Sequence, residues 1–239
     1  NKIMSTLRYQ RVLLKLSGEA FGSTGQGVNP RRLDIIVREL KQLRKLGVAV
    51  AVVVGAGNIW RKRTHGQGLE PAVADYIGLL ATVMNGLALR QALIKARLPV
   101  RLQSAVVFDL PGIGAIDAVA ARGSLRRGEI VIFAGGTGKP FFTTDTAAAQ
   151  RAVQVGAEII IKTSQVSGVY EADPRQHQTA KKFDNITLSQ AIRKNLKVMD
   201  KEAFKICLKN KIPILVCQWQ KGVVVRAVLG KKVGTLVKP

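Results

Sequence analysis

Three glycine-rich loops contain the residues that are best suited to bind a phosphorylated substrate. The first spans residues 15–18 (KLSG), the second residues 55–61 (GAGNIWR) and the third residues 136–145 (GTGKPFFTTD). Backbone amides in loops of this kind surround phosphate oxygens, and a lysine or an arginine beside them neutralises the negative charge. Each loop also fits an ordinary turn between a strand and a helix, so only their combination points to chemistry on phosphate groups.

The third loop is the richest in polar side chains. Thr143 and Thr144 precede Asp145 where a helix is expected to begin, and the amides of a helix N-terminus favour an anion. Asp145 equally fits a first-turn acid that complements the helix dipole. Two other nucleotide-binding signatures are absent: there is no GxxxxGK[ST] motif, and residues 55–57 lack the third glycine of a dinucleotide-binding fingerprint.

Two acids stand inside or beside apolar segments, where a charge needs a partner. Asp75 lies within an apolar helical pattern, and Asp200 comes at the start of another helix. Each acid fits a ligand hydroxyl or a metal, and each also fits an ion pair or a helix cap. A phosphoryl-transfer site needs cations and amides for the phosphate, and acids for the metal, the lysines or the acceptor's sugar. Both histidines, His65 and His177, lie in polar segments, which excludes a Ser-His-Asp triad.

The elements that position these residues alternate between strand and helix. Runs such as residues 48–54 (VAVAVVV) are continuously apolar, which is typical of a parallel sheet covered on both faces. We predict an α/β fold, a three-layer αβα sandwich with a mostly parallel central sheet, in which ligands bind at the carboxyl ends of the strands. The predicted strands span residues 11–16, 48–54, 100–102, 130–134, 158–162, 212–217 and 234–237, and the predicted helices span residues 30–46, 71–96, 116–122, 187–194, 200–210 and a segment from residue 143 or 144.

The length and the composition indicate one folded domain. The chain has 239 residues, 47% of them hydrophobic, enough to bury a large core without disulfides or metals. We predict a single domain over residues 1–239, with two lobes around one sheet at about residues 8–150 and 151–239. The two cysteines are interpreted as buried thiols, and apolar stretches such as residues 77–84 are expected to be too short for a membrane span.

The net charge is the unusual feature of the composition. Lysines and arginines number 38 against 15 acids, giving +23, and self-repulsion makes this surplus costly unless a polyanion screens it. One interpretation is a solvated basic surface without a dedicated partner. The other is binding to the backbone of RNA or to a ribonucleoprotein, with the basic outer face of residues 31–46 as one candidate surface. The charge and the start at Asn1 make an organelle, a mitochondrion or a plastid, the expected location, with the cytoplasm as the alternative.

Several motifs, taken together and in order, make the chain similar to the bacterial-type UMP kinases of the amino-acid-kinase fold. They are KLSGEA (15–20), GAGNIWR (55–61), ADYIGLLATVMNGLAL (74–89), GTGKPFFTTDTAA (136–148), GVYEADP (168–174), LKVMD (196–200) and GTLV (234–237). The resemblance covers essentially the whole chain. It implies transfer of a phosphoryl group from ATP, with Mg²⁺ as the cofactor, to UMP, in a homohexamer without membrane contact.

The resemblance also implies roles for individual residues. The expected catalytic residues are Lys15, Arg61, Asp145 and Asp200. The expected ATP-binding residues are Lys15, Ser17, Gly18, Gly57, Ser164, Tyr170 and Asp173, so the second lobe is the expected ATP side. The expected UMP-binding residues are Gly55, Ala56, Asp75, Thr137, Gly138, Phe141, Thr143 and Thr144, with Asp75 on the ribose. No residue is assigned to a resident metal.

Four departures from the family pattern fall in or beside the loops assigned to UMP, one of them Trp60 at a usual phenylalanine. Ala56 stands at the central glycine of the usual GGGN, Lys62 at a usual glycine, and Lys139 at the usual asparagine of GTGNPFFTTD. Ala56 is expected to hinder approach of the ligand or to strain a backbone conformation reserved for glycine.

These observations leave two hypotheses open. The first is a UMP kinase. The second is a UMP-kinase-derived structural or RNA-binding protein of a ribonucleoprotein, such as an organellar ribosome, with weak or no kinase activity. A third activity, on a carboxylate or a carbamate, is disfavoured by the PFFTTD segment of residues 140–145.

Overall fold

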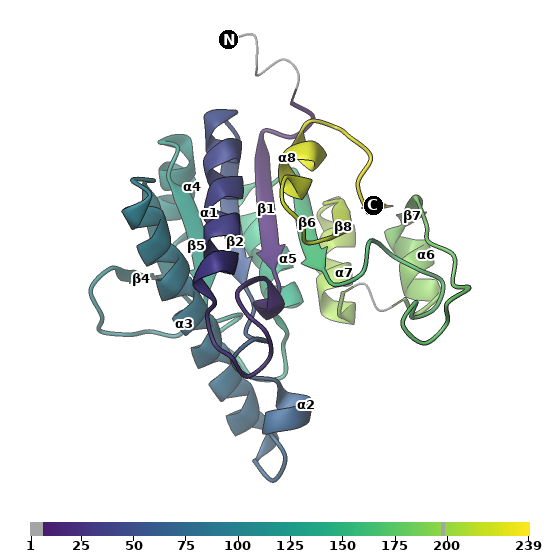
Figure 1. Ribbon diagram of the computed structural model, residues 1–239, viewed down its shortest axis with the longest axis horizontal. Helices are drawn as coiled ribbons and strands as arrows, with labels where there is room; N and C mark the ends of the chain where they lie inside the picture. Colours follow the sequence, from purple (N-terminus) through teal and green to yellow (C-terminus); the bar gives the residue numbers. More distant parts are fainter. Residues whose placement is uncertain (1–6, 197–198) are drawn as a thin grey trace.

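One nine-stranded sheet runs through the protein (Figure 1). The computed structural model describes residues 7–196 and 199–239. The order of the strands in space is β4-β3-β5-β2-β1-β6-β8-β9-β7. Their bounds are β1 (Arg11–Leu16), β2 (Ala49–Val54), β3 (Val100–Ser104), β4 (Ile113–Ala115), β5 (Ile130–Ala134), β6 (Ile159–Ser164), β7 (Asn185–Thr187), β8 (Ile214–Gln218) and β9 (Thr235–Lys238).

The central strands are parallel and apolar on both sides. The described pairings are parallel except that of β8 with β9, which is antiparallel. Every residue of β5 is buried, and in β1 and β2 only the first residue is partly exposed. Such two-sided burial requires helices on both faces of the sheet. The predicted α/β fold with a mostly parallel sheet is therefore confirmed.

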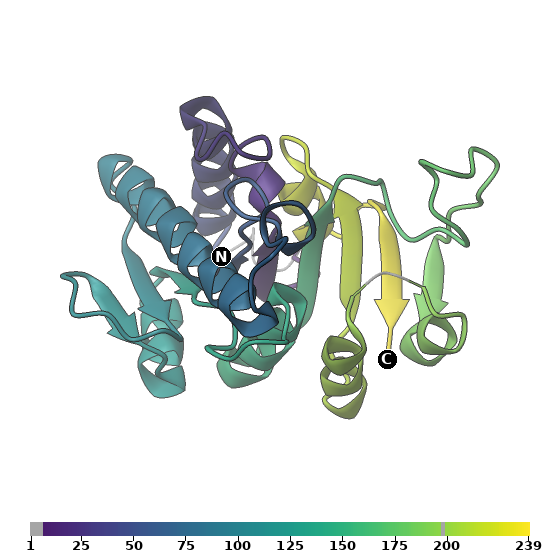
Figure 2. The same cartoon turned by 90° about the horizontal axis from the view of Figure 1, so that it is seen from below.

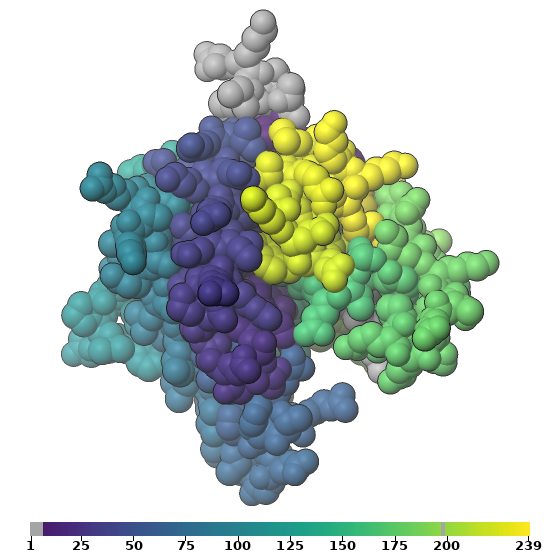
Figure 3. All heavy atoms as spheres, in the orientation of Figure 1, coloured from purple at the N-terminus to yellow at the C-terminus, as the bar shows by residue number. Residues whose placement is uncertain are grey.

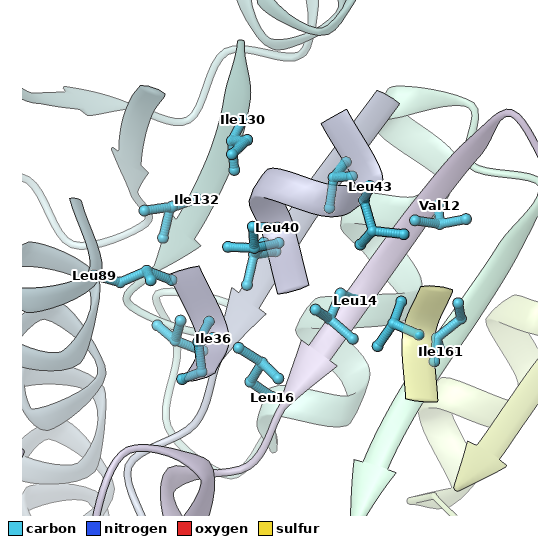
Figure 4. Packing of buried hydrophobic residues seen from close by; sticks show 14 of the residues in the cluster. Val12, Leu14, Leu16, Ile36, Leu40, Leu43, Leu89, Ile130, Ile132 and Ile161 are labelled. Carbon is cyan, nitrogen blue, oxygen red and sulfur yellow. The ribbon is translucent and has the colours of Figure 1, made fainter. Parts of the chain in front are cut away.

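Helices cover the two faces of this sheet and complete three layers (Figure 2). One face carries α1 (Pro30–Lys45), α3 (Pro71–Lys95) and α8 (Val223–Val228), and the other carries α4 (Ala118–Arg126), α5 (Thr144–Val155), α6 (Leu188–Arg193) and α7 (Lys201–Lys209). Alternate residues of β1 pack into two hydrophobic cores, one on each face of the sheet. Val12 and Leu14 pack with Leu40 and Leu43 of α1 (Figure 4), whereas Leu13 belongs to the core under α5.

Polar caps determine where the helices that flank the loops begin. The side chain of Asn29 accepts hydrogen bonds from the amides of Arg31 and Arg32, and Pro30 follows as the first residue of α1. Thr143 caps α5, and Asp200 caps α7. Because a cap satisfies amides that the helix leaves free, these residues fix the chain at the edge where the loops lie.

Five short elements of the described chain have no counterpart in the sequence prediction: β4, β7, α8, the helix α2 (Lys62–His65) and the 3₁₀ helix η2 (Gly18–Ala20). The start of α8 depends on a distant acid, because buried Glu39 accepts hydrogen bonds from the amides of Gly222, Val224 and Val225 at 2.7, 2.8 and 3.0 Å. The predicted helix over 116–122 is displaced, because Asp117 caps it and α4 begins at the next residue.

The expectation that the apolar stretches are too short for a membrane span is wrong for α3. This helix runs without a break for 25 residues, with a mean hydropathy of 1.5 in an 18-residue window, and is the one helix of the described chain that is long and apolar enough to cross a membrane. Within that window, 44% is buried inside the protein. Core helices of folded proteins pass the same test, and α3 packs on β3 and β5.

The two cysteines are buried, unpaired thiols, as predicted. Burial raises the pKa of Cys207 and that of Cys217 to about 12. Both therefore stay protonated and unreactive at neutral pH. The predicted lobe boundary at residue 150 falls inside α5, and the division into lobes stays a prediction.

Candidate functional site

The three glycine-rich loops lie at the carboxyl ends of neighbouring strands. The first follows β1, the second follows β2 and the third follows β5, and all three strands are parallel neighbours in the centre of the sheet. In Figure 1 this edge is the lower end of the molecule, toward which the arrow of β1 points and where α2 lies. The topology therefore gathers the loops at the edge where ligands of open α/β sheets bind.

Two lysines and one aspartate form the charged centre of this edge. Lys15 of β1 and Lys162 of β6 are register partners in adjacent strands, so their side chains leave the same face of the sheet side by side. Asp145, in the first turn of α5, lies between them. Its Oδ1 is 3.1 Å from Lys15 Nζ and its Oδ2 is 2.5 Å from Lys162 Nζ. One carboxylate thus fixes two ammonium groups.

The electrostatics of this cluster follow from burial and from the opposite charges. Burial alone would raise the pKa of Asp145, but attraction by Lys15 and Lys162, with hydrogen bonds from both, lowers it to about 2. Burial lowers the pKa of Lys162, reinforced by repulsion from Lys15, and attraction to Asp145 and Asp200 only partly compensates. The carboxylate is ionised at neutral pH, and it keeps two neighbouring cations in one small volume.

Asp200 joins the starts of α5 and α7. Its carboxylate accepts hydrogen bonds from Thr143 Oγ1 at 2.5 Å, from Thr146 Oγ1 at 2.8 Å and from the amide of Ala203 at 2.7 Å. These hydrogen bonds hold the end of the third loop against the start of α7. Asp200 nevertheless lies close enough to the lysines to stabilise the charge of Lys162.

The first and second loops are in backbone contact. A Cβ on Gly18 would lie 2.0 Å from the amide nitrogen of Gly57 and 2.6 Å from the carbonyl carbon of Ala56, so only glycine fits. Gly55 closes the same junction, because its amide donates a hydrogen bond to the carbonyl of Leu16 at 2.8 Å. The two loops therefore form one surface of backbone groups.

An ion pair links the same two loops through their side chains. Arg61 pairs with Glu19 and also donates from Nε to the carbonyl of Gly57 at 3.1 Å. Burial raises the pKa of Glu19, but hydrogen bonds from its own amide and from Ser17, with attraction to Arg61 and Lys15, lower it overall. The Arg61 guanidinium is thus held over the second loop.

The expected backbone strain at Ala56 is wrong. The described non-glycine residues with a positive φ are Arg97, Phe141, Asn195 and Lys211. Ala56 is not among them, so its backbone conformation is open to any L-residue. Its expected hindrance of a ligand stays a prediction, which a binding measurement has to test.

A buried pair of amides supports the second loop from behind. Asn58 and Asn85 exchange hydrogen bonds at 2.8 and 3.0 Å, and both side chains are fully buried. Asn58 also donates to the carbonyl of Gly27 at 2.8 Å, and Asn85 donates to the carbonyl of Gly55 at 2.7 Å. The nitrogen and the oxygen of both side-chain amides are satisfied, which ties the loop to α3.

Asp75 lies on α3 and faces the third loop. Its Oδ2 accepts a hydrogen bond from the amide of Phe141 at 2.9 Å and pairs with Lys62 Nζ at 3.0 Å. Phe141 has φ +66°, a conformation that a bulky residue rarely adopts, and its side chain is exposed. Backbone strain of this kind clusters at binding sites.

The rest of the third loop is shaped by local turns. Thr137 Oγ1 bonds to both backbone groups of Lys139 at 3.2 Å. Gly138 has φ +79°, and a Cβ there would lie 2.8 Å from the carbonyl oxygen of Ala105. Thr144 is the first residue of α5. The loop thus presents backbone groups and threonines beside Asp145.

The ATP-binding residues expected from the second lobe lie at the end of β6 and in the segment after it. Ser164 ends that strand, and its hydroxyl accepts a hydrogen bond from the amide of Val166 at 3.0 Å. Tyr170 and Asp173 lie farther along, where the Tyr170 hydroxyl is 2.7 Å from that of Ser167 and Asp173 pairs with Arg175 at 2.8 Å. Ser164 thus lies at the carboxyl end of the strand that carries Lys162, whereas the contacts given for Tyr170 and Asp173 are local to the segment after β6.

Sequence reasoning misses several residues of this site. It places Lys162 only as the last residue of a strand, although a lysine ending an apolar strand is the same signal that singles out Lys15. Glu19 and the Asn58–Asn85 pair carry no local signal, because their partners are 42 and 27 residues away. Within the described ranges, no group of three or more His, Cys, Asp or Glu side chains is placed to hold a metal.

The chain is similar to one family model and to solved structures of nucleotide kinases. Residues 10–218 match the family model described as the amino acid kinase family. The UMP kinase of Bacillus anthracis is 36% identical, with 96% of each chain covered and a TM-score of 0.91. The UMP kinase of Ureaplasma parvum is 31% identical, covering 98% of this chain and 100% of its own, with a TM-score of 0.89. The uridylate kinase of Archaeoglobus fulgidus is 27% identical, covering 95% of this chain and 99% of its own, with a TM-score of 0.71.

Proposed function

The chain belongs to the amino acid kinase family, and we propose that within it this protein transfers the terminal phosphoryl group of ATP to UMP, giving ADP and UDP. The observation that carries the proposal is the cluster of Lys15, Lys162 and Asp145 at the carboxyl edge of the sheet. The likeness to two UMP kinases along almost the whole chain supports the choice of acceptor.

We propose a distinct task for each of the charged residues. A phosphate oxygen of UMP attacks the γ-phosphorus of ATP, the bond from that phosphorus to the β-bridging oxygen breaks, and its electron pair leaves with ADP. Lys15 and Lys162 neutralise the charge on the moving phosphoryl group, and Asp145 positions both ammonium groups. Arg61 would leave Glu19 to bind a substrate phosphate. Positioning and charge neutralisation suffice, so no general base is required.

Mg²⁺ fits this chain as a partner of ATP better than as a resident ion. In the described part of the chain, no set of three candidate metal ligands lies together, and Asp145 and Asp200 are engaged by lysines and threonines. Bound to ATP, the metal supplies further charge neutralisation on the phosphate oxygens.

The direct test is ADP production by the purified chain with ATP and Mg²⁺, measured with UMP, CMP, AMP or GMP as acceptor. The proposal predicts turnover that depends on UMP and exceeds that with the other acceptors. A double variant, Ala56→Gly with Lys139→Asn, tests the two departures in the loops. Turnover that appears only in this variant would support the alternative of a protein with a disabled site.

Self-association is a further part of the proposal. One face of α3 exposes an apolar stripe of Val73, Tyr76, Leu80 and Met84, each 44–57% exposed. Contiguous exposed apolar surface of this kind marks protein interfaces. We propose that the stripe contacts a second copy of the chain in a homohexamer.

We expect Met84→Lys to lower the mass of the assembly in solution, because a buried lysine without a partner opposes association. The measurement is light scattering after size-exclusion chromatography. Val119→Lys is the matched control, since Val119 is 68% exposed on α4, away from the stripe. A wild-type monomer, or equal masses for wild type and Met84→Lys, would count against the proposal.

Binding to an RNA backbone is a second candidate function, favoured by a basic face over α1 and the turn before α8. A cavity of about 260 Å³ on this face is lined by four cations, Arg38, Lys41 and Lys45 of α1 and Lys221 just before α8. Glu39 lies in the same cavity, but amides of the α8 segment take up its carboxylate. Figure 3 shows α1 and the C-terminal segment side by side on this face. The cations therefore face solvent with little opposing charge, as a phosphate backbone requires.

Changing all four of these cations to glutamine is expected to weaken binding of a single-stranded RNA about tenfold or more. The slope of the logarithm of the binding constant against the logarithm of the salt concentration should also become less steep. The expected change is roughly 0.7 for each phosphate that the variant no longer neutralises. The control variant changes four other exposed cations, on or near α6 and α7, to glutamine: Arg193, Lys194, Lys209 and Lys211. Equal weakening in both variants, or no RNA binding by the wild type, would argue for a merely solvated charge.

A further inference from the structure

The carboxylate of Asp75 is already occupied in the protein by a cation from its own chain. Lys62, the first residue of α2, places Nζ 3.0 Å from Oδ2 of Asp75. The same oxygen accepts the hydrogen bond from the amide of Phe141 at 2.9 Å. Both of these interactions therefore fall on one of the two carboxylate oxygens.

The position of Lys62 ties three elements together. Its ammonium lies 5.6 Å from the centroid of the Phe141 ring, so it touches α3 and the third loop while it belongs to α2. The Lys62 side chain is 45% exposed and that of Asp75 is 20% exposed. Such a pair is held weakly and opens without unfolding anything, because water can solvate both charges once they separate.

We propose that Lys62 is a specificity-determining residue that competes with the acceptor's sugar for Asp75. This inference rests on the proposed function, and on the role in it that the family resemblance implies for Asp75, which is to hold the ribose of UMP. A sugar with two adjacent hydroxyls donates two hydrogen bonds and binds a carboxylate best through both oxygens. With Lys62 and Phe141 on Oδ2, the sugar has to displace the ammonium group or use one hydroxyl alone.

Competition of this kind predicts the direction in which the affinity for UMP changes when Lys62 is replaced. Removing the ammonium group frees Oδ2 for the sugar, so UMP should bind more tightly to a Lys62→Met variant, by about two- to fivefold, the scale of a partly exposed ion pair. The opposite sign is expected if Lys62 instead binds the phosphate of the acceptor. Methionine keeps the length of the side chain against the Phe141 ring and removes only the charge.

The test is calorimetric titration of the full chain with UMP and with 2′,3′-dideoxy-UMP, which lacks both hydroxyls. We expect the Lys62→Met variant to bind UMP more tightly than the wild type and to bind the dideoxy ligand no more tightly. Arg63→Met is the matched control, because Arg63 is an exposed cation on the same short helix. It should change the binding of both ligands equally and slightly.

Three outcomes would overturn the inference. Equal UMP affinity in the wild type and in Lys62→Met would show that Lys62 does not compete with the sugar for Asp75. The proposed function would be unaffected by that result. Weaker binding of both ligands by Lys62→Met makes Lys62 a phosphate ligand. The failure of every variant to bind UMP rejects the proposed function itself, and the inference with it.

Discussion

Replacing Lys15 by methionine is expected to lower kcat for phosphoryl transfer by about 10²- to 10³-fold, the usual loss when one preorganised charge donor is removed. Lys15 is 7% exposed and its ammonium group is fixed by Asp145, so water cannot replace that group at low cost. Of the two lysines of the cluster, Lys162 alone would then neutralise the charge of the reacting phosphoryl group. The measurement is steady-state kinetics with ATP and UMP varied separately.

The fold should survive this change. Asp145 keeps its pair with Lys162 at 2.5 Å, and methionine fills the volume of the lysine chain at the end of β1. Thermal unfolding of the Lys15→Met variant provides the control for folding. A variant that folds normally and retains wild-type kcat would remove Lys15 from the chemistry.

Replacing Asp145 by asparagine is expected to lower the free energy of unfolding by about 3–5 kcal/mol, because the buried Lys15 and the largely buried Lys162 lose their shared counter-charge. Each ammonium group would then repel the other across the register pair of β1 and β6. The pKa of Lys162, already lowered by burial and by Lys15, should fall further. Phosphoryl transfer should be lost together with the position of the two cations.

The stability difference should depend on pH with a defined sign. The pKa of Asp145 is about 2 in the folded chain, below the ordinary 3.8, so its ionised form contributes stability at pH values above about 4. That contribution disappears as the pH falls through the range from about 4 to 2. The gap between wild type and Asp145→Asn should therefore narrow in this range, as denaturant unfolding at several pH values would measure.

Asp173 supplies the control for this second prediction. It forms an exposed pair with Arg175, so Asp173→Asn should change the free energy of unfolding by less than about 1 kcal/mol. Equal effects of the two substitutions would mean that the lysine cluster contributes no more than a surface ion pair.

The sequence predicts the frame of this site well because the frame is local in origin. Apolar runs such as β2 and caps such as Asn29 and Thr143 depend on a few neighbouring residues. Short segments of the sequence are therefore enough to predict the strands and the helix starts. The gathering of the three glycine-rich loops follows from the parallel sheet.

The interactions inside the site are less predictable because they depend on register and on distant partners. Nothing local to Lys162 says that it lies opposite Lys15. Arg61 and Glu19 are separated by 42 residues, and Lys62 and Asp75 by 13 residues across a turn. The sequence marks Ala56 as strained, whereas its φ is ordinary. Tertiary geometry decides each of these points.

The cluster of Lys15, Lys162 and Asp145 is expected to support phosphoryl transfer to UMP. The most direct measurement is ³¹P NMR of the wild-type chain with ATP, Mg²⁺ and UMP, beside the Lys15→Met variant. UDP and ADP should appear in equal amounts with the wild type, and almost none of either should appear with the variant. ADP without UDP, or UDP formed at the same rate by both proteins, would contradict this expectation.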